Sequence, residues 1–87
     1  MGKFIVVLGD ITTHGGKVLY ASSSLEISGK PAALFNDITT CPLHGINSII
    51  QCDVSVYEEN GRGIVLHGCI TQCGATVIAG VRDMEVS

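Results

Sequence analysis

Charged side chains are scarce in this sequence. They make up 15% of the 87 residues, where soluble domains usually carry about a quarter, and the net charge is −3. The five basic residues are spread along the chain: Lys3, Lys17, Lys30, Arg62 and Arg82. Because a nucleic-acid-binding face needs clustered Lys and Arg to neutralise phosphates, this distribution argues against nucleic acid as a partner. So little charge also favours a domain that buries part of its surface against another protein.

Large aromatic side chains and long apolar runs are also missing. There is no Trp, and only two Phe and two Tyr, although 46% of the residues are hydrophobic. The apolar mass is Ile, Val, Leu and Ala, which favours thin β-structure. No run is long enough for a membrane-spanning helix, and the N-terminal run is too short for a signal peptide. We therefore expect synthesis in the cytoplasm, with any export by a machine that needs no cleavable signal.

Helical periodicity is absent as well. No apolar pattern with a period of 3.6 residues continues for three turns, whereas segments of strand length rich in β-branched residues recur. The pairs Ser28-Gly29 and Asn60-Gly61 are typical of tight hairpin turns. These features predict a single all-β domain over residues 1–87. The expected strands are 3–8, 17–21, 24–27, 46–51, 54–58, 63–66 and 75–79.

One short motif occurs three times in the sequence. It reads ITTHGG at residues 11–16, ITTCPLHG at 38–45 and ITQCGA at 70–75. Asp37 follows Asp10 by 27 residues, and residues 28–41 align with residues 60–73 without a gap. In this alignment the first copy lacks an N-terminal half. Three hairpin copies predict pseudo-threefold symmetry, with equivalent loops that converge at one end.

His14, Cys41 and Cys73 occupy the same position of the three copies. His44 follows Cys41 in a C-x2-H spacing, so that one tight turn could supply two ligands. Cysteines in a reducing compartment that stand beside histidines indicate a metal before a disulfide. Two thiolates and two imidazoles are a typical closed, tetrahedral structural zinc site. The sequence therefore predicts one zinc ion, and glycines at 15, 45 and 74 would allow the sharp turns around it.

Two neighbouring residues leave alternatives for this ligand set. His67 and Cys69 precede Cys73, and either could replace Cys41 or His44 as a ligand. Cys69 stands where the other copies have aspartate, so it is also interpreted as a thiol that caps the loop. His67 aligns with apparent strand ends and is also interpreted as a partly buried imidazole.

Catalysis is poorly supported. Asp10 and Asp37 could form an acid–base pair, but an aspartate before a Thr turn more often accepts hydrogen bonds from backbone amides. A redox pair of Cys69 and Cys73 beside His67 is a further hypothesis, which predicts a reactive thiol. A closed shell of four ligands leaves no open coordination position for chemistry. We predict a structural protein and no enzyme.

Four motifs in this order resemble the PAAR-repeat proteins: GDITTHGG, GKPAALFND, CPLHG and CGATVIAG. The family signature is present as Pro31-Ala32-Ala33, with Leu34 in place of Arg. The resemblance implies a small cone of β-structure with a zinc ion near its vertex. It also implies that the base of the cone caps a trimeric β-helical spike, the valine-glycine repeat protein of type VI secretion or its phage counterpart. Such a tip helps to pierce the target envelope.

The family's zinc ligands correspond to His14, Cys41, His44 and Cys73 in this chain. This chain departs from the family pattern in two places. Cys41 stands where histidine is a common ligand, and the HGC triplet at 67–69 differs from the usual sequence there. Many members carry toxin domains fused to the cone. Only seven residues follow the last motif here, so we expect a bare tip that at most holds separate effector proteins. The alternative function is a free-standing, zinc-stabilised binding module with another protein partner.

Overall fold

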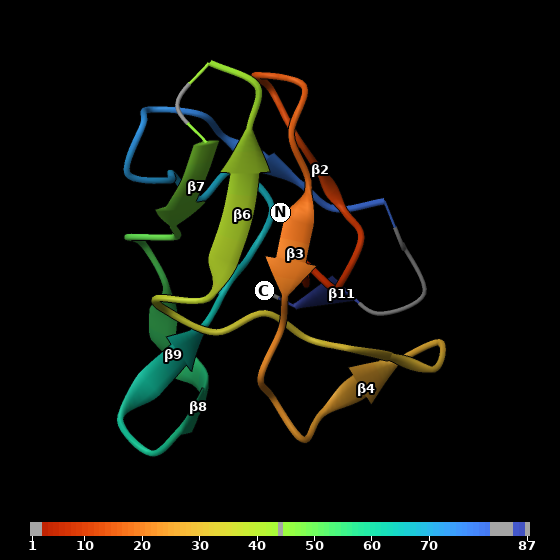
Figure 1. Ribbon diagram of the computed structural model, residues 1–87. Coiled ribbons are helices and arrows are strands. Elements are labelled where there is room, and N and C mark those ends of the chain that lie inside the picture. Colours follow the sequence, from red (N-terminus) through yellow and green to blue (C-terminus); the bar gives the residue numbers. More distant parts are fainter. Residues whose placement is uncertain (1–2, 44, 81–84, 87) are drawn as a thin grey trace.

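The structure is a computed structural model that describes residues 3–43, 45–80 and 85–86. These residues form short β-strands and turns, and no helix occurs among them (Figure 1). Within the same ranges, no helix has the length and hydropathy needed to cross a membrane. The all-β prediction is confirmed. The strands are β1 (Lys3–Phe4), β2 (Ile11–Thr12), β3 (Val18–Tyr20), β4 (Glu26–Ile27), β5 (Lys30–Pro31), β6 (Ile38–Cys41), β7 (Gly45–Ser48), β8 (Asp53–Glu59), β9 (Arg62–Ile64), β10 (Val77–Ile78) and β11 (Glu85–Val86).

Two hairpins form where the sequence predicted them. β4 pairs with β5 through a turn at Ser28 and Gly29, and β8 pairs with β9 through a turn at Asn60 and Gly61. All four turn residues have positive φ, between 53° and 79°. A two-residue turn with positive φ at both positions matches the right-handed twist of the flanking strands. Figure 1 shows both hairpins at the lower end of the molecule.

A third antiparallel strand pair has the same form as these hairpins but no connecting turn, because its strands come from the two ends of the chain. β11 pairs antiparallel with β1, so that Lys3 faces Val86 and Phe4 faces Glu85. The register repeats that of the other two hairpins, in which Lys30 faces Ile27 and Arg62 faces Glu59. The expectation that the first copy lacks an N-terminal half is therefore wrong, because the C-terminal strand supplies that half. We call the three pairs β4–β5, β8–β9 and β1–β11 the basal hairpins.

Beyond the hairpins, one segment of each copy enters the middle of the molecule. These core segments, residues 4–8, 31–35 and 63–67, bond to one another in a closed ring. The amide of Val6 donates to the carbonyl of Val65 at 3.0 Å, Val65 donates to Ala33 at 2.9 Å, and Ala33 donates back to Val6 at 2.9 Å. All three residues are fully buried. Each copy thus pairs with both others, which is the pseudo-threefold arrangement that the repeat predicted.

The core consists of two layers of small aliphatic side chains along this ring. Neither layer needs a large aromatic side chain, because the three segments approach one another closely and each contributes a branched or small residue. The layer nearer the basal hairpins contains Ile5, Val7, Ile27, Ala32, Leu34, Ile64 and Leu66. The second layer contains Val6, Val18, Ala33, Ile49, Val65, Val77 and Ala79.

Past the core, each copy continues as an apical segment: residues 10–19, 37–50 and 69–78. The Ile-Thr motif of the first two copies was expected in loops, yet it forms strands β2 and β6. Its second position is a buried threonine in every copy, at Thr12, Thr39 and Thr71. β-Branched threonine suits an extended backbone, and its hydroxyl finds a local hydrogen-bond partner. The loops therefore begin only after these residues.

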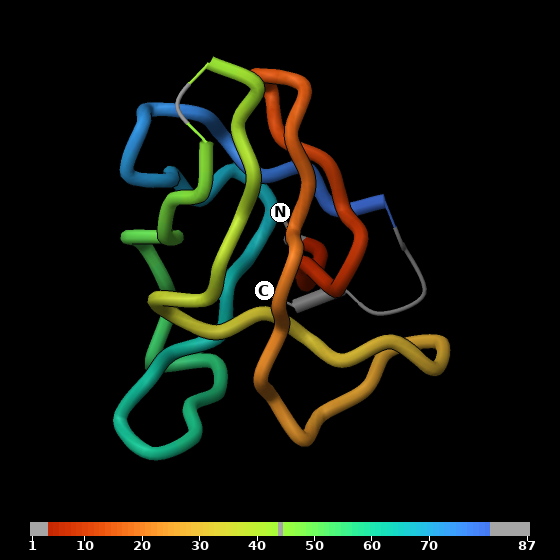
Figure 2. Tube along the Cα trace, viewed as in Figure 1, coloured from red at the N-terminus to blue at the C-terminus, as the bar shows by residue number. Residues whose placement is uncertain are grey.

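A second ring of backbone hydrogen bonds joins the apical segments. The amide of Thr13 donates to the carbonyl of Thr76, and the amide of Thr40 donates to that of Lys17, each at 2.9 Å. The ring closes through a bond of 2.8 Å from the amide of Gln72 to Ser48. The apical turns of the first two copies lie side by side at the top of the tube in Figure 2, opposite the hairpins β4–β5 and β8–β9.

Asp10 and Asp37 hold the bends between core and apical segments. Oδ2 of Asp10 accepts from the amide of Val7 at 2.9 Å, and Oδ2 of Asp37 accepts from the amide of Leu34 at 2.7 Å. Both carboxylates are buried. The prediction that these aspartates bond backbone amides is confirmed, and each is committed to the fold.

Candidate metal centre

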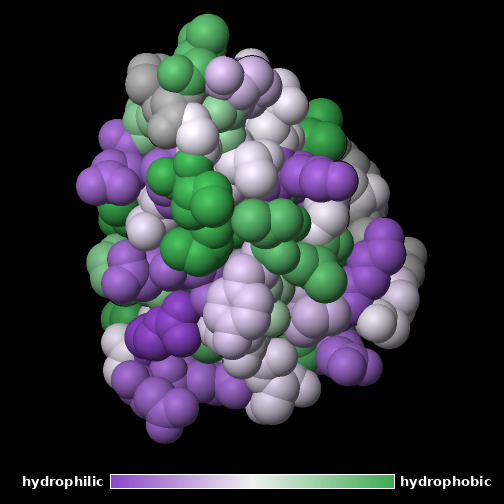
Figure 3. Space-filling view, viewed as in Figure 1, coloured by the Kyte–Doolittle hydropathy of each residue, from purple (hydrophilic) through white to green (hydrophobic). Residues whose placement is uncertain are grey.

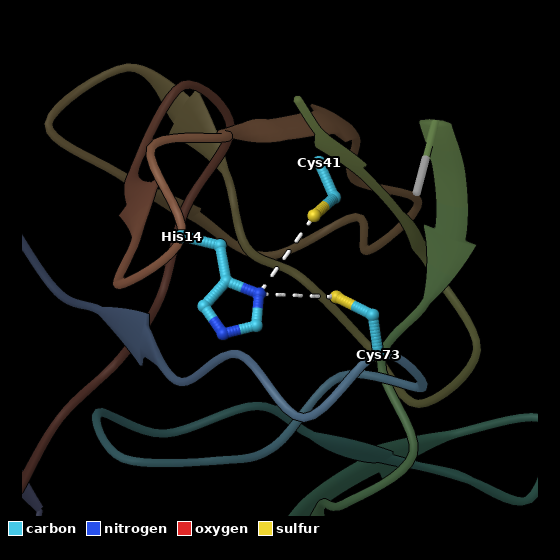
Figure 4. A group of neighbouring side chains, drawn as sticks. All are labelled: His14, Cys41 and Cys73. Carbon is cyan, nitrogen blue, oxygen red and sulfur yellow. Dashed lines mark hydrogen bonds between the residues drawn. The ribbon is translucent and has the colours of Figure 1, made fainter. Parts of the chain in front are cut away.

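Three side chains meet where the apical turns converge. Nδ1 of His14 lies 3.7 Å from Sγ of Cys41 and 3.6 Å from Sγ of Cys73 (Figure 4). The three ligand atoms all lie within 4.8 Å of one another. The predicted convergence of these three residues is therefore present in the structure, with one side chain from each copy.

These side chains share a position in the repeat, but their local structures differ. Cys41 is the last residue of β6, and it is buried, while His14 and Cys73 stand in turns and are partly exposed. The residues that follow them, Gly15 and Gly74, have φ of +85° and +89°, a conformation that non-glycine residues rarely adopt. The chain can therefore reverse immediately after His14 and after Cys73.

The local electrostatics favour a thiolate. The Thr71 hydroxyl, 3.4 Å from Sγ of Cys73, lowers the pKa of the Cys73 thiol to about 6. The amide of Ala75 and the side chains of Cys41 and His14 act in the same direction, against an opposing effect of burial. A thiolate, rather than a thiol, is the form that binds metal ions. At neutral pH the site thus offers a negatively charged sulfur to a cation.

The donor separations fit a small tetrahedral ion. With metal–sulfur bonds of about 2.3 Å and metal–nitrogen bonds of about 2.05 Å, tetrahedral angles place S and N about 3.5 Å apart and two S atoms about 3.8 Å apart. The two observed S···N separations, 3.7 and 3.6 Å, match the first value, and the limit of 4.8 Å admits the second. The group of His14, Cys41 and Cys73 could therefore hold a metal ion with little rearrangement.

The fourth predicted ligand, His44, lies outside the described residues. Its neighbourhood in the sequence is nevertheless informative. The second copy needs four more residues than the others to pass from its ligand position to the next core residue, Cys41 to Ile49 against His14 to Val18. His44 belongs to this additional segment, directly before Gly45, which pairs with Cys41 across the β6–β7 hairpin.

His67 and Cys69 are not part of the cluster that the described residues form. His67 is exposed rather than partly buried as predicted, and its Nδ1 accepts from the amide of Ala79 at 3.0 Å. Cys69 is half-buried and packs against both core layers. Its amide donates to Leu66 at 3.1 Å, as Asp10 does to Val7, so it occupies the bend that aspartate holds in the other copies.

Cys52 lines a pocket of about 490 Å³ together with Cys69. The pocket lies between the second and third copies, and its other lining residues are Phe35, Ile50, Gln51, Asp53 and Leu66. Sequence reasoning could not find it, because no motif links these positions. It is separate from the His14 cluster.

Comparison with known proteins supports the family assignment. No curated protein matches the chain. The family model of the PAAR motif matches residues 8–79 of the 87-residue chain, a range that includes the three converging side chains and all three apical segments. The chain therefore belongs to the PAAR motif family, the spike-tip proteins of type VI secretion and phage-tail-like machines.

Proposed function

We propose that this protein is the metal-clasped tip that caps the trimeric spike of a type VI secretion or phage-tail-like machine. The observation that carries the proposal is the polarity of the fold. Three ligand-type side chains, one from each copy, meet at one end, and three basal hairpins with the same register form the other. Together with family membership, this supports a tip whose vertex is fixed by an ion and whose base faces a threefold partner.

The basal hairpins suit a trimeric β-helical partner. Their pseudo-threefold arrangement would let each hairpin face one subunit of the spike, and short strand edges could continue its β-structure. Charged residues also gather on this part of the chain. The hairpins and the residues next to them contain Lys30, Arg62, Glu26, Glu58 and Glu59. Figure 3 shows hydrophilic surface along the lower edge of the face in view.

The apical segments have the opposite character. Among their described residues, Asp10 and Asp37 are buried, and Lys17 is the one charged side chain that is exposed. Large apolar side chains are exposed instead: Ile11, Leu19, Leu43, Ile46, Ile50 and Ile70. Figure 3 shows hydrophobic surface over the middle and top of the same face. A leading end with little charge suits entry into an envelope, because few hydrated ions must be stripped of water.

We assign zinc to the metal centre, with His14, Cys41, His44 and Cys73 as its ligands. Two thiolates and two imidazoles favour zinc over harder cations, and a complete shell makes the ion structural rather than catalytic. When bound, the ion cross-links the three apical turns. In small zinc domains such binding contributes roughly 10–16 kcal/mol to folding. His14 alone connects the first copy to this clasp.

Metal analysis of the purified protein tests the clasp. One equivalent of zinc is expected, with loss on His14→Ala, Cys41→Ser, His44→Ala or Cys73→Ser. His67→Ala and Cys69→Ser are the matched controls and should retain the ion. Retention of full zinc by the His14→Ala variant would contradict the three-copy clasp.

Capture of the purified spike trimer tests the partner. The tip should bind one spike trimer per chain, and substitutions on the basal hairpins should weaken capture while those on the apex should not. A protein that binds zinc but never binds the spike would support the second candidate, a zinc-stabilised binding module for another partner. That candidate is favoured only by the proposed metal site and not by the threefold base.

A further inference from the structure

The two cysteines of the metal centre lie close enough to react with each other. Their sulfur atoms are within 4.8 Å, and the two residues come from different copies at the same repeat position. A disulfide requires a sulfur–sulfur distance of about 2.05 Å, so the thiols must approach by less than about 3 Å. Cys73 stands in a turn next to Gly74 and is partly exposed. Movement of this turn alone could bring the sulfurs together.

We propose that Cys41 and Cys73 form a disulfide between the second and third copies when the protein meets a disulfide oxidant. The thiolate of one cysteine attacks the external disulfide and releases one small thiol, which leaves a mixed disulfide on the protein. The second cysteine then attacks the protein sulfur of that bond and releases the second small thiol. In sum, two protein thiols and one external disulfide give one protein disulfide and two small thiols. The two electrons pass to the oxidant.

The cross-link goes beyond the proposed function, because it depends on the proximity of two thiols and not on the spike or on the ion. Its effect on the apex differs from that of a metal. An ion joins three copies, whereas a disulfide joins only the second and third and leaves His14 of the first copy outside the bond. Exported proteins meet oxidising conditions, where disulfides persist. The apex would then remain cross-linked even after two of its ligands are oxidised.

The remaining two cysteines provide the internal control. Cys52 and Cys69 both line the pocket beside Phe35, away from the metal cluster. Trypsin cleaves after Arg62, which separates Cys41 and Cys52 on one side from Cys69 and Cys73 on the other. The double variant C52S/C69S keeps only the apical pair, and C41S/C73S keeps only the pocket pair. Each variant therefore reports on a single possible intramolecular disulfide.

The experiment treats both variants and the unsubstituted protein with oxidised glutathione, with and without prior metal removal, and maps tryptic peptides by mass spectrometry. We expect C52S/C69S to give one linked peptide pair through Cys41 and Cys73, more slowly when metal is bound, with metal release in step. C41S/C73S should give little linkage. H14A in the C52S/C69S background tests the metal site and the disulfide separately. Loss of the metal with an unchanged Cys41–Cys73 cross-link would support both proposals.

The proposal is overturned if C52S/C69S accumulates only glutathione adducts or links between chains. If C52S/C69S fails to fold, the unsubstituted protein decides. If the tryptic peptides of the unsubstituted protein are linked and C41S/C73S gives the same linkage, the result also contradicts a disulfide between Cys41 and Cys73. Absence of metal from a protein that still forms the Cys41–Cys73 bond would contradict the zinc clasp and leave the cross-link standing.

Discussion

Gly16 of the first copy packs directly against the backbone of Thr40 in the second. A Cβ atom on Gly16 would stand 1.7 Å from the carbonyl oxygen of Thr40 and 2.6 Å from its carbonyl carbon. Nearby, the amide of Lys17 donates to the hydroxyl of Thr40 at 3.1 Å, and the amide of Thr40 donates to the carbonyl of Lys17 at 2.9 Å. The close contact between the first two copies beside the metal centre therefore requires glycine at position 16.

Replacing Gly16 with alanine should destabilise the protein by about 3 kcal/mol or more, because rigid backbone must move to admit the methyl group. Gly29→Ala is the matched control. Gly29 has φ of +79° but no neighbour within 4 Å of a built Cβ, so only about 1 kcal/mol of backbone strain is expected. Chemical denaturation of both variants measures the difference. Equal losses of stability would show that the copies are not packed as described.

Arg62 joins the third copy to the buried carboxylate of the second. Its Nη2 donates to Oδ1 of Asp37 at 2.7 Å, and its Nε donates to the carbonyl of Phe35 at 2.8 Å. Arg62→Gln should reduce the free energy of unfolding by about 1–3 kcal/mol, since Asp37 keeps its bonds from Leu34 and Ser22 but loses its counter-ion. Lys30→Gln changes the equivalent, exposed position of the second copy and should have little effect. Thermal unfolding of the two variants tests this contrast.

Glu59, at the end of β8, joins the hairpin β8–β9 to the segment before β4. Its carboxylate accepts from the hydroxyl of Ser23 at 2.6 Å, the amide of Ser24 at 2.8 Å and the hydroxyl of Ser24 at 2.8 Å. The bond from Ser23, followed by those from Ser24, lowers the pKa of the Glu59 carboxyl below its ordinary value of 4.5. The contribution to stability is therefore complete above pH 4.5 and disappears as the pH falls through the lower, folded-state pKa.

Glu59→Gln should be less stable than the parent at neutral pH, and this gap should narrow in acid. Glu58→Gln, on an exposed neighbouring side chain, is the control. Denaturation curves measured from neutral pH down to pH values below the folded-state pKa of Glu59 test this prediction. A gap that stays constant with pH would mean that the carboxylate charge has no part in the contact.

The pairing of β1 with β11 closes the first copy. Removal of Glu85–Ser87 should lower the free energy of unfolding by about 1–3 kcal/mol, because the strand hydrogen bonds of β1 are lost at about 0.5–1.5 kcal/mol each. It should also weaken spike capture, since one of three basal hairpins is gone. Removal of Ser87 alone is the control. Unchanged stability and capture after the longer deletion would contradict the closure.

Local signals in the sequence were sufficient for the hairpin turns and for the convergence of three ligand-type side chains. Ser28-Gly29 and Asn60-Gly61 determine their turns through backbone conformation, and the repeat position of His14, Cys41 and Cys73 carried the convergence. The fourth ligand, His44, stays a prediction. The strand character of the Ile-Thr motif was missed, because strands as short as β2 depend on pairing with other copies more than on propensity.

The closure by β11 was also missed, for a related reason. Nothing within residues 80–87 indicates a hairpin half, since its partner lies at the opposite end of the chain. The exposure of His67 was mispredicted because its position was interpreted as a packed strand end, whereas of its two equivalents Phe35 is half-buried and Leu8 is exposed. Repeat alignment transfers backbone position reliably, but it does not transfer the side-chain environment when residue types differ.

The closed rings of hydrogen bonds have a kinetic consequence. They join Val6 to Val65 and Thr13 to Thr76, so the first copy cannot complete its pairing until nearly the whole chain is present. Proteins whose contacts are distant in sequence fold slowly, because loop entropy is lost before the contacts can compensate for it. Assembly should therefore be late and cooperative. The ligand cluster at the apex can form only at the end of this process.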